Sequence, residues 1–175
     1  AVRHGDGQWP GLNVARLCVE KLFPVCSPQL LRGRGALRSP DDLKHHTLLH
    51  ANATGDWVKW LKLVGAGDVD VKRGTVFNQA SMAIDAAVDG QGIVLARTAL
   101  AAWDLLSGRL VRPFPQALEA PYALWIVCPT AAADLPKIAT FRNWLLEEAA
   151  DDIRRLAELE LPTGERNNSR DQRQH

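Results

Sequence analysis

VDGQGIVLARTALAAWDLLSGRLVRPF, residues 88–114, is the stretch that decides the fold class. Gly90 and Gly92 end a helix, and the apolar residues 93–96 that follow predict a short buried strand. The next residues, 98–106, predict a second helix that ends at Gly108. Helices and strands that alternate through such short connections are typical of α/β proteins.

The same alternation continues on both sides of this stretch. Strands are predicted at 1–5, 12–17, 20–28, 47–50, 71–77, 110–114 and 122–128, and helices at 40–43, 57–64, 81–88 and from Pro136 onward. Ser39 and Ser81 are the expected N-caps of two of these helices. Pro24 indicates an edge or crossing strand. We expect an α/β fold with a mostly parallel sheet.

The final helix has a clear apolar face but no clear end. Ile138, Phe141, Leu145 and Ala149 share one side, and the continuation beyond them is left open by the sequence. Residues 162–175 are polar and are predicted to be disordered.

Composition excludes several classes of function. The chain has 175 residues, enough for one domain or two small lobes, and a net charge of +1 without a basic stripe. Direct DNA binding through these residues is therefore not expected. No apolar run is long enough to span a bilayer, and no signal peptide is visible. Because the chain begins with Ala1 and its only methionine is Met82, we expect a fragment of a longer protein.

The cysteines and histidines give little support for a metal or redox site. Three cysteines without a C-x-x-C spacing are expected to be reduced thiols, and the alternative is that Cys26 and Cys128 are neighbours on crossing strands. The histidines at 45, 46 and 50 lie in a segment that favours a strand, and no carboxylate or cysteine nearby completes a metal site. No metal and no cofactor is expected.

Two further motifs have competing interpretations. Gly90-Gln91-Gly92 lies between a helix and a strand, which is the reverse of a dinucleotide-binding loop, so a helix C-cap is favoured. Ser81 lacks the G-x-S-x-G setting of a nucleophile. It either only caps its helix or also contacts a carboxylate ligand at the helix N-terminus. Four tryptophans on apolar faces are expected in the core or an interface: Trp57, Trp60, Trp125 and Trp144.

Several segments in this order carry a family resemblance. They are EKLFPVCSPQLL (20–31), LRSPDDLKHHTLLH (37–50), the opening stretch (88–114) and YALWIVCPTAAADLPKIATFRNWLLEEA (122–149). This pattern resembles the effector-binding region of LysR-type transcriptional regulators, nearest to the group of the glycine cleavage system activator and the β-lactamase regulator. The likeness covers about residues 1–150.

The resemblance implies a fold like the type II periplasmic binding proteins, with two Rossmann-like lobes joined by two crossing strands. The crossings would lie near 22–27 and 122–128. Lobe I, with the crossing strands, would comprise 1–28 and 120–152, lobe II 29–119, and 153–175 the end of the helix and the tail. The helix-turn-helix and the first part of lobe I would be missing, so the chain appears as an N-terminally truncated domain with an incomplete first lobe.

The resemblance also implies a ligand site in the cleft between the lobes. The residues expected there are Arg3, His4, Gly5, Asn78, Gln79, Ser81 and Thr98. His50, Arg97 and Trp125 are weaker candidates.

We therefore expect an effector-sensing domain rather than an enzyme. Its partners would be a small-molecule effector, such as an amino acid or another carboxylate, and further copies of the chain in a homodimer or tetramer. DNA would be contacted only through the missing helix-turn-helix domain, in a cytoplasmic protein without membrane contact. The alternatives are a solute-binding protein of a transport system and an α/β enzyme, for which the chain offers no base–nucleophile pair or phosphate loop.

Overall fold

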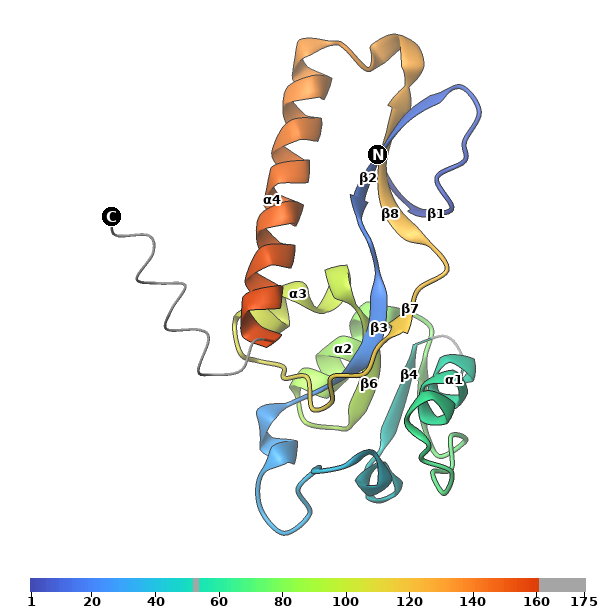
Figure 1. Cartoon of the computed structure of the whole chain (residues 1–175), viewed down its shortest axis with the longest axis vertical. Coiled ribbons are helices and arrows are strands. Elements are labelled where there is room, and N and C mark those ends of the chain that lie inside the picture. The colour runs from blue at the N-terminus through green and yellow to red at the C-terminus, as the bar shows by residue number, and fades with distance from the viewer. Residues whose placement is uncertain (52–53, 161–175) are drawn as a thin grey trace, which may run out of the picture.

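The computed structural model describes residues 1–51 and 54–160, and the predicted disorder at 162–175 lies outside this range. Its strands form two separate sheets (Figure 1). The strands are β1 (Val2–Gly5), β2 (Leu12–Cys18), β3 (Lys21–Cys26), β4 (Leu48–Ala51), β5 (Gly74–Phe77), β6 (Ile93–Arg97), β7 (Leu118–Glu119) and β8 (Ala123–Pro129). The α-helices are α1 (Gly55–Val64), α2 (Ala80–Val88), α3 (Thr98–Leu106) and α4 (Pro136–Glu160), with 3-10 turns at Pro28–Leu31, Pro40–His45 and Thr130–Ala132.

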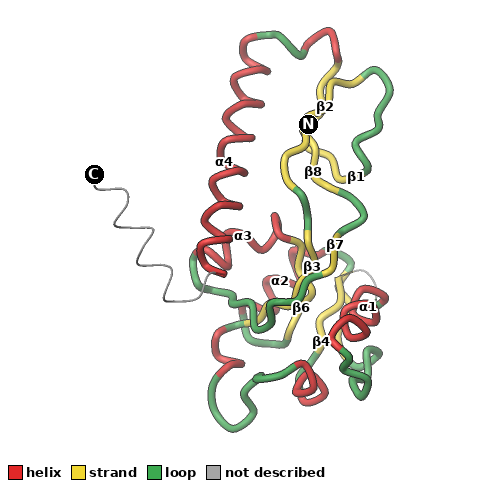
Figure 2. Tube along the Cα trace, viewed as in Figure 1, coloured by secondary structure: helices red, strands yellow, loops and turns green. Residues whose placement is uncertain are grey.

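The two sheets mark two lobes. The three-stranded sheet has the order β1-β8-β2 and, with α4, is called lobe I here; the five-stranded sheet has the order β5-β4-β6-β3-β7 and, with α1 to α3, is called lobe II. The chain passes from lobe I to lobe II between β2 and β3 and returns between β7 and β8 (Figure 2). Two lobes joined by two crossings agree with the expected fold class. The exact lobe boundaries given above stay a prediction.

The sheet of lobe II is mixed, so the expectation of a mostly parallel sheet is wrong. β4 runs parallel to β5 and β6, whereas β3 runs antiparallel to β6 and β7. Only β4, β5 and β6 are linked through helices within the lobe, as parallel strands require. β3 enters from the other lobe and β7 leads back to it, which frees both from that requirement.

Apolar side chains cover both faces of the lobe II sheet. Leu49 and Val94 pack with α2 and α3 on one face, while Leu48 and Ile93 pack with α1 on the other. Trp57 and Trp60 of α1 are buried, as expected for core residues. Their indole N–H groups donate to the carbonyls of Leu49 and Gln116 at 3.2 and 3.1 Å, so neither polar group is left unpaired.

Most predicted elements are confirmed near their predicted bounds. The helix and strand in the opening stretch are α3 and β6, and α1 ends at Gly65, whose φ of 74° is left-handed. The helix from Pro136 does continue beyond Ala149, through Glu160. None of the helices in the described ranges is long and apolar enough to cross a membrane.

Three local expectations are wrong, and one alternative is excluded. The strand predicted at 71–77 begins only at Gly74, after a turn. Ser81 is not the N-cap, because α2 begins at Ala80 and the carbonyl of Gln79 accepts the N–H of Ala83 at 3.4 Å. Residues 110–114 make one isolated bridge, between Val111 and Cys26, because Pro113 has no N–H for a ladder. Cys26 and Cys128 lie in different sheets rather than side by side.

Candidate functional site

A small pocket lies where the parallel strands of lobe II end. Its walls come from both flanking helices and three strands: Leu22, Leu49, Ala51, Asp56, Trp57, Ala80, Ile84, Leu95, Ala96 and Arg97. Ala51 and Arg97 are the last residues of β4 and β6, and Asp56 and Ala80 lie in the first turns of α1 and α2. The carboxyl edge of an open α/β sheet is where ligands usually bind. The volume of about 50 Å³ gives room for only a few non-hydrogen atoms.

Arg97 connects this pocket to lobe I. Its Nη1 atom lies 2.8 Å from Nε2 of His4 on β1 and 3.5 Å from Oε2 of Glu20, in the connection between β2 and β3. Because a guanidinium can only donate, His4 Nε2 is the acceptor in this contact. Glu20 is only 1% exposed and also lies 3.7 Å from His4. The pocket wall, the crossing segment and lobe I thus meet in one cluster of three polar side chains.

Glu20 also occupies the N-terminus of α3. Its Oε1 atom accepts the N–H of Ala99 at 3.3 Å, so the exposed donors of that first turn already face a carboxylate. Thr98 contacts the same crossing strand, since its hydroxyl accepts the N–H of Lys21 at 3.1 Å. These two bonds hold the outward crossing against lobe II.

The predicted site residues divide into two groups. His4 and Thr98 belong to the cluster around Glu20, while Asn78, Gln79 and Ser81 are exposed beside Ala80 at the rim of the pocket. Arg3 and Gly5 do not join them, because neighbouring side chains on a strand point to opposite faces. The Arg3 guanidinium lies over the Trp9 ring, 5.9 Å from its centroid, and a Cβ on Gly5 would meet that ring at 2.7 Å.

The weaker candidates also separate. Arg97 lines the pocket, whereas His50 is 1% exposed and does not. Neither ring nitrogen of His50 has a hydrogen-bond partner, and burial lowers its pKa below the ordinary histidine value. The Trp125 indole donates to the Gly5 carbonyl at 3.0 Å and so packs within lobe I.

Three residues of this region were missed by the sequence argument. Glu20 and Asp56 are charged residue types that are usually exposed, and nothing in their spacing marks them as buried or pocket-lining. Tyr122 precedes β8, and its ring makes an edge contact with His4 at 5.6 Å between centroids. A polar residue within a crossing segment is the one signal that could have singled out Glu20, because such segments are shared by both lobes.

The site shows no arrangement for covalent chemistry. Among the residues that the structure describes, no three His, Cys, Asp or Glu side chains are grouped as metal ligands. Burial raises the pKa of Cys18 to about 11 and that of Cys26 to about 12, which keeps both thiols protonated and unreactive. The small pocket is lined by the Arg97 guanidinium, the Asp56 carboxylate and apolar side chains.

Comparison with known proteins decides the family. The model of the LysR substrate binding domain matches residues 1–150. This chain belongs to that family. The glycine cleavage system transcriptional activator of Escherichia coli K12 is 43% identical over 150 residues, which are 86% of this chain and 49% of that protein. The transcriptional activator AmpR of Pseudomonas aeruginosa is 31% identical over 155 residues, 88% of this chain and 51% of AmpR.

Solved structures of the same family share the fold. The effector domain of P. aeruginosa AmpR is 31% identical, with a TM-score of 0.66 over 87% of this chain and 73% of that domain. The AmpR effector binding domain of Citrobacter freundii is 25% identical, with a TM-score of 0.68 over 86% and 74%. The type II periplasmic-binding-protein-like fold is thus confirmed. This LysR domain spans about half the length of the curated relatives it matches.

The class of function follows the family. These relatives are transcriptional regulators, which agrees with the expected effector-sensing domain and does not favour a transport protein. The expected ligand residues are placed by the structure as described above, and their contact with an effector stays a prediction.

Proposed function

We propose that this LysR domain senses a small carboxylate, such as an amino acid, bound between its two lobes. The pocket at the ends of β4 and β6 supports this proposal because Arg97, at its rim, is also in contact with His4 of lobe I. A ligand that pairs with the Arg97 guanidinium would therefore act on the contact between the lobes. Its carboxylate would pair with a cation, and the small volume favours a short molecule.

The proposed response is a change in the relative orientation of the lobes. An effector can shift this orientation only by its different affinity for the two arrangements. Binding at Arg97 supplies such a difference, because a ligand carboxylate competes with His4 and Glu20 for the same guanidinium. In the whole regulator, which we propose to be cytoplasmic and a homodimer or tetramer, a separate helix-turn-helix domain would convert the shift into altered DNA contacts. No catalytic step is proposed.

Asn78, Gln79 and Ser81 are proposed to contact the effector beside Ala80. They are exposed at the first turn of α2, where unpaired N–H groups favour an anion. Since Ser81 does not cap the helix, its hydroxyl is available for a ligand rather than needed for stability.

A thermal-shift screen of the chain tests this proposal. The panel consists of the protein amino acids and carboxylates of two to six carbons, and at least one compound is expected to raise the Tm in a saturable way. Ser81→Ala should unfold within about 0.5 kcal/mol of the parent yet lose most of that shift. Ser107→Ala, at the far end of α3, is the matched control and should respond like the parent. A panel without any saturable response contradicts the proposal, and an unchanged response in Ser81→Ala removes Ser81 from the site.

A further inference from the structure

The last helix continues past the part of the chain that the family shares. The match to the LysR substrate binding domain ends at residue 150, whereas α4 runs on to Glu160. In Figure 1, α4 descends from beside the strands of lobe I to α3 of lobe II. Its contacts agree with this view, since α4 packs against both β2 and α3. Residues 151–160 are called the extension below.

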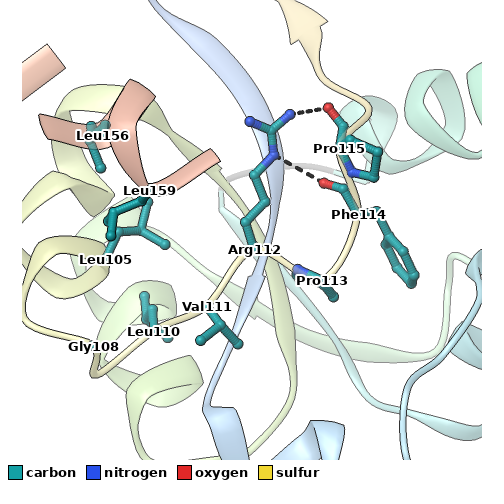
Figure 3. A pocket seen from close by; sticks show the side chains of 10 residues that line it. All are labelled: Leu105, Gly108, Leu110, Val111, Arg112, Pro113, Phe114, Pro115, Leu156 and Leu159. Atoms are coloured by element: carbon teal, nitrogen blue, oxygen red, sulfur yellow. Dashed lines mark hydrogen bonds between the residues drawn. The ribbon is translucent and has the colours of Figure 1, made fainter. Parts of the chain in front are cut away.

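The extension faces lobe II with two leucines. Leu156 and Leu159 face Leu105 and Leu110 across a cavity of about 560 Å³ (Figure 3). The rest of the cavity wall is the segment after α3, comprising Gly108, Val111, Arg112, Pro113, Phe114 and Pro115. Val111 pairs with Cys26 at the end of β3 farthest from Arg97, because Cys26 opposes Ile93 and Leu22 opposes Arg97. The contact is therefore separate from the pocket described above.

The extension also carries charged side chains that pair with one another. Arg154 pairs with Asp151, and Arg155 lies 4.0 Å from Asp151 and 3.8 Å from Asp152. Pairs at this spacing support a continuous helix. A continuous helix transmits its position from one end to the other, so α4 joins lobe I to lobe II independently of the two crossing strands.

We propose that the extension is a strap that fixes the resting orientation of the two lobes. Any rotation of lobe II against lobe I must slide or release the contacts of Leu156 and Leu159. The strap is held loosely: Leu159 is 44% exposed, and no side chain of α4 within residues 136–159 is fully buried. Such a contact can open while the core of either lobe stays intact. This consequence rests on the effector sensing proposed above. Part of the free energy of effector binding must then release the strap before the lobes can move.

The test measures the distance between the lobes without any ligand. Spin labels are placed at Gln8→Cys in lobe I and Lys62→Cys in lobe II, both exposed positions, with Cys128 replaced by serine. Cys18 and Cys26 remain, because both side chains are buried and inaccessible to the label in the folded chain. We expect one narrow distance distribution in this parent and a distribution at least twice as broad, or shifted, in Leu156→Asp.

The matched control is Ala157→Asp, which adds the same carboxylate one position along on the exposed side of α4. It should keep the narrow distribution. If Leu156→Asp loses its helical circular dichroism, the double variant Leu156→Ala with Leu159→Ala replaces it, with the same broadening expected. A parent-like distribution in the folded leucine variant, or equal broadening in Ala157→Asp, overturns the strap. Because no effector is present, either outcome leaves the sensing proposal to its own screen.

Discussion

Glu20 is the residue on which both lobes depend. Its carboxylate is almost fully buried in the outward crossing, where it faces Arg97 and the N-terminus of α3 in lobe II and His4 in lobe I. A buried carboxylate is tolerated only when such partners replace water. Rotation of lobe I would change the contact of Glu20 with His4. The contacts of Glu20 with Arg97 and Ala99 are contacts with lobe II.

Glu20→Gln should therefore destabilise the chain by about 1–3 kcal/mol, since a neutral amide leaves the Arg97 guanidinium without its carboxylate. Urea unfolding followed by circular dichroism measures this difference. Glu119→Gln is the matched control, because that carboxylate is 73% exposed in its pair with Lys21. It should cost no more than about 0.5 kcal/mol. Equal losses of unfolding free energy in the two variants would contradict this, because the buried Glu20 would then stabilise the fold no more than an exposed glutamate does.

His50 should make the stability of the chain sensitive to acid. Burial lowers its pKa in the folded state, so the unfolded chain, with an ordinary pKa of about 6.5, binds the proton more readily. The contribution of neutral His50 is complete above about pH 6.5 and is lost as the pH falls through that value, until the folded-state pKa is reached. The slope from this one group is at most about 1.4 kcal/mol per pH unit.

His50→Leu should reduce the dependence of the unfolding free energy on pH between pH 7.5 and 5, as measured by urea unfolding. It should also raise the unfolding free energy at pH 7 by about 1 kcal/mol, because two unpaired ring nitrogens leave the core. His45→Leu, which removes an exposed histidine, is the control and should keep the parent slope. A His50→Leu profile as steep as the parent profile would contradict the assignment.

The sequence predicted strand and helix ends at one edge of lobe II but not the side-chain contacts found there, and effector binding by these residues stays a prediction. Strand and helix ends can be read from glycines and apolar periodicity, so 78–81 and 97–98 were placed correctly at the ends of β5 and β6. The role of Glu20 depends on side chains from positions 4, 97 and 99, which meet only in the folded chain. Alternation along β1 also separates His4 from Arg3 and Gly5, and the sequence argument grouped all three.

At the scale of elements, β5 illustrates why one predicted strand was too long. Val71 continues the alternating pattern, but residues 71–73 form a turn and Gly74 starts the strand with a φ of 149°. A Cβ at Gly74 would lie 1.9 Å from the Leu48 carbonyl oxygen of the paired β4. The close approach of two backbones, which only glycine permits, is invisible in a hydrophobic pattern.

Gly74→Ala should therefore cost about 3 kcal/mol or more, because both the backbone conformation and the strand pairing must change. Gly67→Ala is the matched control, since its Cβ would meet nothing within 4 Å and no positive φ constrains it. It should be neutral or stabilise by up to about 1 kcal/mol. Thermal unfolding of the two variants measures both values, and a Tm of Gly74→Ala close to that of Gly67→Ala would refute the close approach.

At the scale of the whole molecule, lobe I is thinner than lobe II. It consists of three strands and α4, and the chain covers 73% of the solved AmpR effector domain it resembles. Phe141, on the predicted apolar face of α4, and Trp144, expected in a core or an interface, are 57% and 50% exposed and contact each other. The apolar pattern of a single helix does not reveal how much of its face the rest of the lobe covers.

The central claim is that a small carboxylate binds between the lobes at the pocket beside Arg97. The most direct measurement is calorimetric titration of the chain with the panel compound that raises its Tm most, repeated on Ala80→Phe. The new ring would fill a pocket of about 50 Å³ from the first turn of α2. We predict saturable binding to the parent chain and at least a tenfold weaker affinity in a folded Ala80→Phe. Equal affinities in the two proteins would place the ligand elsewhere and contradict the account.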